Sequence, residues 1–131
     1  MHKTEALGPI TASTDRFLQT VRALTDADIA GATLVPPWTR GHVITHVARA
    51  TDSLCRLLTW ARTGVETPQY ASMDARAAEI EAGARRPVRE LAADVVATAE
   101  RFDLGWLTGR ADGTGLTTTG PGPVPRAPYW I

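Results

Sequence analysis

The sequence predicts an all-α protein, folded as an up-and-down helical bundle. Apolar residues recur at helical spacing in several segments, and no segment gives a convincing strand pattern. Glycines and prolines lie between these segments, where they end one helix and precede the next. With 131 residues, the chain is long enough for one compact domain but not for two.

The first helix is expected over residues 10–24. Its apolar positions follow the 3.6-residue period: Phe17, Leu18, Val21 and Leu24. Thr25 then offers an N-cap, with Asp28 three residues later in the pattern of a capping box, so a short helical turn should follow through Ile29.

The second helix is expected over residues 40–63, with Thr39 as its N-cap and Gly64 as the glycine that ends it. Its apolar positions again keep the helical period: Val43, Ile44, Val47, Thr51, Leu54, Leu58 and Ala61. The centre of this apolar face is predicted around Val47, Leu54 and Leu58.

Two further helices are predicted, a short one over residues 74–82 and a longer one over residues 88–103. The helical pattern is lost from residue 105 onward, where glycine and proline are frequent. We therefore divide the chain into a helical bundle over residues 1–104 and a Gly/Pro-rich tail over residues 105–131. Three main helices are present, and a fourth that would bury the last apolar stripe is largely missing.

The composition of the chain excludes some classes of function. Fourteen basic residues balance fourteen acidic ones, which removes the broad positive field expected for binding nucleic acid or an anionic membrane. The chain has one cysteine, Cys55, and no apolar run of spanning length or leader-like N-terminus, so a cytoplasmic location is expected. We predict that Cys55, on the apolar face of the second helix, is a buried small hydrophobic residue rather than a nucleophile.

Two histidines four residues apart, His42 and His46, lie on one flank of the second helix. This flank is about 100° from the apolar centre of the helix, at the rim of the core. The pair could bind a metal in a cleft between helices, or it could consist of ordinary polar residues on a half-buried helix. Spacing alone does not decide, because a catalytic zinc takes three protein ligands.

The segments "WTRGHVITHVARATDSL", residues 38–54, and "YASMDARAAEIEAGA", residues 70–84, resemble the N-terminal metal-binding domain of the mycothiol-dependent maleylpyruvate isomerase family. This family belongs with the DinB-like four-helix bundles. The resemblance extends over residues 10–104. It implies a zinc-dependent domain that activates the thiol of mycothiol towards an electrophilic small molecule, as in the isomerisation of maleylpyruvate or a related thiol transfer.

The resemblance also implies roles for individual residues. His46 occupies the position of the family's metal ligand, with His42 as a second candidate. Arg49, Arg76 and Glu79 are candidates for lining the site of the thiol or the substrate. The other two zinc ligands of the family, a glutamate and a histidine spaced E-x-x-x-H, come from a fourth helix.

The sequence departs from the family pattern at Ala50, at Ala77 and at its end, since no E-x-x-x-H segment is present before Ile131. We therefore expect a truncated family member whose isolated chain is catalytically impaired. The alternative is a non-catalytic helical module that uses the open apolar face for binding or for forming a homodimer.

Overall fold

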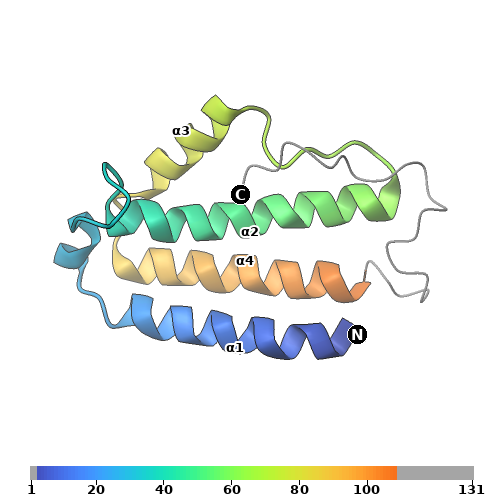
Figure 1. Ribbon diagram of the computed structural model, residues 1–131, viewed down its shortest axis with the longest axis horizontal. Coiled ribbons are helices and arrows are strands. Elements are labelled where there is room, and N and C mark those ends of the chain that lie inside the picture. The colour runs from blue at the N-terminus through green and yellow to red at the C-terminus, as the bar shows by residue number, and fades with distance from the viewer. Residues whose placement is uncertain (1–2, 109–131) are drawn as a thin grey trace.

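The computed structural model describes residues 3–108, and all the elements in this range are helical. Three long helices form the body of the molecule (Figure 1): α1 (Lys3–Arg22), α2 (Arg40–Thr63) and α4 (Val88–Thr108). A short helix, α3 (Met73–Gly83), lies across the outer side of α2, and a single 3-10 helix, η1 (Asp26–Ala30), follows α1. The prediction of an all-helical bundle is confirmed.

The direction of each helix follows from its connections (Figure 1). α1 runs antiparallel to α2, and α2 and α4 run in the same direction. The chain can place α4 parallel to α2 because the loop after Gly64 and then α3 carry it back along the bundle. This return path puts α3 beside the N-terminal half of α2, where both histidines lie.

The predicted caps are present in the structure. Thr25 and Asp28 form a reciprocal capping box at the start of η1, and Thr39 caps α2. Gly64 ends α2 in the left-handed conformation, with a φ of 71° that favours glycine. Ser72, which was not predicted as a cap, accepts a hydrogen bond from the N–H of Ala75 at the start of α3.

The hydrophobic core lies between α4 and the helices on either side of it. Leu91 is fully buried at its centre, and the neighbouring α2 residues that pack there are small or β-branched, such as Ile44 and Ala48. α1 contributes Leu18 and Val21. Two ion pairs join α2 and α4, Arg49–Asp94 and Arg101–Asp52, and Arg86 in the turn before α4 also pairs with Asp94. We call this group of ion pairs the α2–α4 seam.

Two helix boundaries differ from the prediction by five residues or more. α1 begins at Lys3 instead of residue 10, because the helix continues through Pro9, whose surroundings are exposed and tolerate the missing N–H. α4 continues five residues past the predicted end at 103. Phe102 and Trp106 stack one helical turn apart, with ring centroids separated by 6.2 Å, and this contact supports the extra turn. Residues 105–108, which were assigned to the tail, are therefore part of α4, and the rest of the predicted tail lies outside the described residues.

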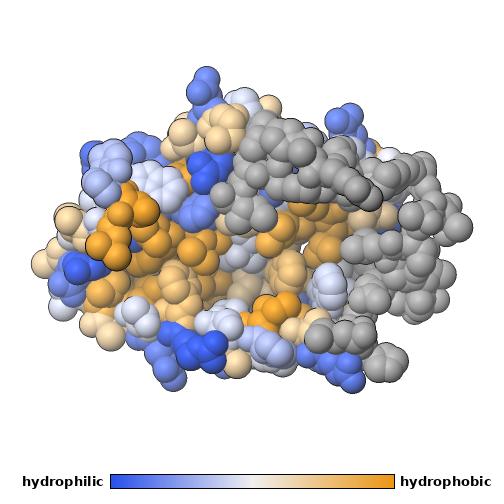
Figure 2. Space-filling model, in the orientation of Figure 1, coloured by the Kyte–Doolittle hydropathy of each residue, from blue (hydrophilic) through white to orange (hydrophobic). Residues whose placement is uncertain are grey.

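The predicted apolar centre of α2 was wrong. Val47, Leu54 and Leu58 are only half-buried, whereas Ile44 and Ala48 of α2 are buried in the core cluster that includes Leu91 of α4. Val47 and Leu54 line a groove of about 270 Å³ together with Ile10 of α1 and Phe102 of α4. Figure 2 shows hydrophobic residues gathered along the middle of the visible face, with hydrophilic residues at its margins. No described element covers this groove, which explains the incomplete burial.

Within residues 3–108, no helix combines the length and the apolar character needed to cross a membrane.

Candidate functional site

The first turn of α2 fixes the position of His42. The backbone N–H of Thr39 donates to Nδ1 of His42 at 3.1 Å, and the Thr39 hydroxyl contacts the same nitrogen at 2.8 Å. His42 therefore takes the place that a glutamate or glutamine usually has in a capping box. Because a backbone N–H can only donate, Nδ1 is the acceptor, and the neutral ring carries its proton on Nε2.

The second ring nitrogen of His42 is also engaged. Nε2 lies 2.7 Å from Oε2 of Glu81, so the imidazole joins the N-terminus of α2 to α3. This contact could not be predicted from the sequence, since a glutamate on a helix gives no signal of a partner 39 residues away. With both nitrogens bonded, His42 is a structural link between two helices and has no free nitrogen for a metal.

His46, one turn further along α2, has a different environment. Its ring centroid is 5.3 Å from that of Trp38, at an interplanar angle of 44°. Nη2 of Arg76, on α3, lies 3.4 Å from Nδ1 of His46. Since a guanidinium can only donate, this contact assigns Nδ1 as the acceptor. Nε2 of His46 has no hydrogen-bond partner among the described residues.

The surroundings of His46 favour its neutral form. Partial burial lowers the pKa of His46, and the nearby Arg76 guanidinium lowers it further. A neutral imidazole is the form that binds a metal ion. The two histidines that were indistinguishable by spacing are therefore separated by their contacts.

Trp38 connects these residues. Its ring stacks near His42, with centroids 6.5 Å apart and planes inclined by only 10°. The guanidinium carbon of Arg76 lies 6.0 Å from the Trp38 centroid, within the range of a cation–π contact. Trp38 is thus the common neighbour of both histidines and of Arg76.

Arg49 and Glu79 lie apart from this group. Arg49 points to the α2–α4 seam, where its Nη2 is 2.5 Å from Oδ1 of Asp94 and 3.6 Å from Oδ2 of Asp52. Glu79 is exposed on α3 and forms no ion pair with a described residue. Of the three predicted lining residues, the structure brings only Arg76 to His46.

Cys55 is half-buried in α2. Burial raises the pKa of its thiol, and the Asp52 carboxylate raises it further, against smaller opposite effects of Arg101 and Arg56. A thiol with a raised pKa is a poor nucleophile at neutral pH. This environment supports the packing role predicted for Cys55.

The described residues supply one metal ligand and not a complete site. No three histidine, cysteine, aspartate or glutamate side chains within residues 3–108 come together as a group that could hold a metal ion. His46 fits as a single donor, through the free Nε2. A zinc site with three protein ligands cannot be assembled from this part of the chain alone.

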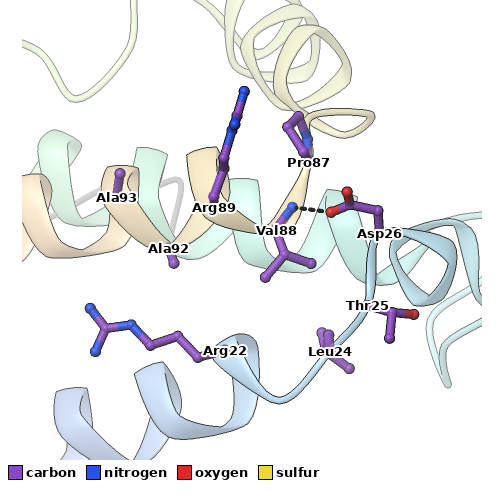
Figure 3. Close-up of a pocket in the computed structure, with 9 residues that line it drawn as sticks. All are labelled: Arg22, Leu24, Thr25, Asp26, Pro87, Val88, Arg89, Ala92 and Ala93. Atoms are coloured by element: carbon purple, nitrogen blue, oxygen red, sulfur yellow. Dashed lines mark hydrogen bonds between the residues drawn. The ribbon is translucent and has the colours of Figure 1, made fainter.

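Another hollow, of about 830 Å³, lies at the junction of α1, η1 and α4 (Figure 3). There the carboxylate of Asp26 accepts a hydrogen bond of 2.8 Å from the N–H of Val88 and so caps α4. The two arginines on its rim, Arg22 and Arg89, point in different directions in Figure 3 and do not converge on a common point. A second hollow is bounded by Trp38, His42 and Glu81 and adjoins the histidine cluster.

Comparison with known proteins agrees with the arrangement of these helices. Residues 10–131 match the family described as the mycothiol maleylpyruvate isomerase N-terminal domain. No match was found among curated proteins.

Two solved structures are similar to the chain. A crystal structure of the mycothiol-dependent maleylpyruvate isomerase has 32% identity and a TM-score of 0.76, and a histidine-to-alanine mutant of that enzyme has 31% and 0.75. Each match covers 82% of this chain and 45% of the other, so the chain spans less than half the length of these structures. The match over nearly the whole chain shows that it belongs to the mycothiol maleylpyruvate isomerase N-terminal domain family.

Proposed function

We propose that this chain is a thiol-handling domain of the mycothiol-dependent isomerase type, with His46 as one ligand of a zinc site. The observation that carries the proposal is the contrast between the two histidines. His42 has both nitrogens bonded to Thr39 and Glu81, whereas His46 is held by Trp38 and Arg76 with Nε2 free. The name of the related enzymes supports mycothiol as the thiol and a maleylpyruvate-like electrophile as the substrate.

The chemistry assigned to zinc is to lower the pKa of a bound thiol, so that the thiolate can add to the electrophile. The described residues provide one of the three protein ligands, and we propose that a glutamate and a histidine from outside them complete the site. On this account, the isolated chain is catalytically impaired. A reducing, cytoplasmic setting is part of the proposal, because a free thiol is the cosubstrate.

Metal titration tests this function. Zinc is added to the purified, metal-free chain and to the His46→Ala variant, with His42→Gln as the matched control on the same helix. We expect zinc binding to weaken at least about tenfold in His46→Ala, because a direct ligand is lost, and to persist in His42→Gln.

Equal binding by the chain and by His46→Ala would contradict the assignment of His46. The absence of saturable binding by the unmodified chain would contradict zinc binding by this chain. In the same preparations, turnover of maleylpyruvate with mycothiol and zinc at the rate of a full-length relative would contradict the proposed impairment.

A second function is favoured by the groove between α1, α2 and α4. Val47, Leu54 and Phe102 are half-buried there, with no described element above them. A surface of this kind suits a helical binding module or a homodimer. Sedimentation of the chain and of Val47→Asp separates the possibilities: a dimer that dissociates in the variant supports this function, and a monomer at all concentrations contradicts the homodimer.

A further inference from the structure

The described part of the chain contains four half-buried arginines, and three of them have a clear oxygen partner. Arg49 and Arg86 share the carboxylate of Asp94 in the α2–α4 seam. Arg56 donates through Nε to the carbonyl of Gln69 at 2.6 Å and lies over the ring of Tyr70. Arg76 is the fourth, and within residues 3–108 its one hydrogen-bond contact is the long one to His46.

The positive charge of Arg76 has no compensation nearby. No carboxylate of a described residue lies within ion-pair distance of its guanidinium. Its Nε is buried without a hydrogen-bond partner. A partly buried cation with an unsatisfied donor is unfavourable unless an anion can reach it.

One neighbouring feature strengthens the positive field at this point. Arg76 is near the start of α3, where the helix dipole already places partial positive charge. Its neighbour His46 cannot compensate the charge of Arg76, because an imidazole carries no negative charge. The Trp38 ring holds the guanidinium from one side, so its position is fixed without an acidic partner.

We propose that Arg76 binds a carboxylate of the electrophilic substrate next to His46. The assignment deepens the proposed function and rests on it for the identity of the substrate. The planar guanidinium can donate two parallel hydrogen bonds to a carboxylate, which suits it to orient such a group. A substrate held there by one carboxylate would present its unsaturated carbon chain to the thiol site beside His46.

Binding of a small dicarboxylate to the metal-free, thiol-free chain tests this role. Maleate is titrated while the side-chain N–H signals of the arginines and tryptophans are followed by NMR. We expect saturable shifts of the Arg76 and Trp38 signals below about 10 mM maleate. Arg76→Gln should weaken binding at least about tenfold, since a charged hydrogen-bond donor is lost. Arg76→Lys should restore part of the affinity, because lysine keeps the positive charge but cannot donate the two parallel hydrogen bonds of a guanidinium.

Arg56→Gln is the matched control, because Arg56 is equally half-buried and also lies over an aromatic ring, but has its own acceptor. It should bind maleate as the unmodified chain does. Equal binding by Arg76→Gln, no saturable binding by the unmodified chain, or binding of inorganic phosphate at least as tight as maleate would overturn the assignment. The assay contains no zinc, so its failure is distinct from the failure of the zinc titration.

Discussion

The two sides of α2 show how differently one helix can use its polar residues. On the side of α4, Arg49 of α2 and Arg86 of the turn before α4 share Asp94, and the core residues of α2 and α4 are buried. On the side of α3, His46 and Arg76 are in contact, and no carboxylate of a described residue pairs with Arg76, whose Nε has no hydrogen-bond partner within residues 3–108. The first side is arranged for stability, and the second keeps hydrogen-bonding capacity for a ligand.

The largest expected difference is in the free energy of unfolding that is lost when a core leucine or a groove leucine is truncated. Leu91 is fully buried in the core, whereas Leu54 lies half-buried in the open groove. We expect Leu91→Ala to lower the free energy of unfolding by about 2–5 kcal/mol, because it leaves a cavity that its neighbours cannot fill. Leu54→Ala should cost about 1 kcal/mol, since much of that side chain already contacts water. Urea denaturation measures both, and equal losses would show that the groove is covered in solution.

The second largest effect on stability is expected from the ion pairs of the α2–α4 seam. Removing the carboxylate in Asp94→Ala leaves Arg49 and Arg86, both under a third exposed, without their shared partner. We expect a loss of about 1–3 kcal/mol in the free energy of unfolding, below the value for a fully buried pair. Addition of 1 M salt should remove only a small part of the effect of this pair, because burial limits screening. A loss within error of zero would contradict a stabilising seam.

Removal of a carboxylate on the α3 side of α2 should lower the free energy of unfolding less than Asp94→Ala does. Glu81→Gln weakens the link to His42, but the Glu81 side chain is 58% exposed. We expect a loss of no more than about 0.5 kcal/mol, typical of an exposed pair. Thermal unfolding of the variant beside Asp94→Ala gives the comparison. A larger loss for Glu81→Gln than for Asp94→Ala would reverse the contrast between the two sides.

The smallest predicted effect is a pH dependence from His46. Its pKa in the folded chain lies below the ordinary value of 6.5. The unfolded chain therefore takes up a proton first as the pH falls, so stability should decrease below about pH 6.5 until the folded pKa is passed. His46→Gln should show a shallower loss of stability between pH 7.5 and 5.5 in the presence of a chelator. An unchanged slope would mean that the contacts with Trp38 and Arg76 do not hold in solution.

Local signals made much of the fold predictable. Thr39, Gly64 and the capping box at Thr25 act through residues close in sequence, and all three are where the sequence placed them. The apolar centre of α2 was misplaced because periodicity shows that a face is apolar but not which element packs on it. Small residues such as Ala48 faced α4, and the larger Val47 faced the groove.

The site was predictable to a lesser degree. The sequence marked His46 and Arg76, but the partner of His42 comes from a helix 39 residues away. Similarly, only the fold shows that Arg49 is bonded to Asp94, 45 residues on, and that Arg76 forms no ion pair with an acidic residue of the described range. Contacts between distant segments, rather than residue types, distinguish a structural arginine from one available to a ligand.

The central claim, that His46 is available to a metal ion and His42 is not, can be tested at the level of single nitrogens. Long-range ¹H–¹⁵N NMR of the histidine rings, recorded while zinc is added to the metal-free chain, reports both residues in one experiment. The account predicts that Nε2 of His46 changes its chemical shift while both nitrogens of His42 keep theirs. A shift of His42 at lower zinc concentration than His46, or of His42 alone, would contradict it.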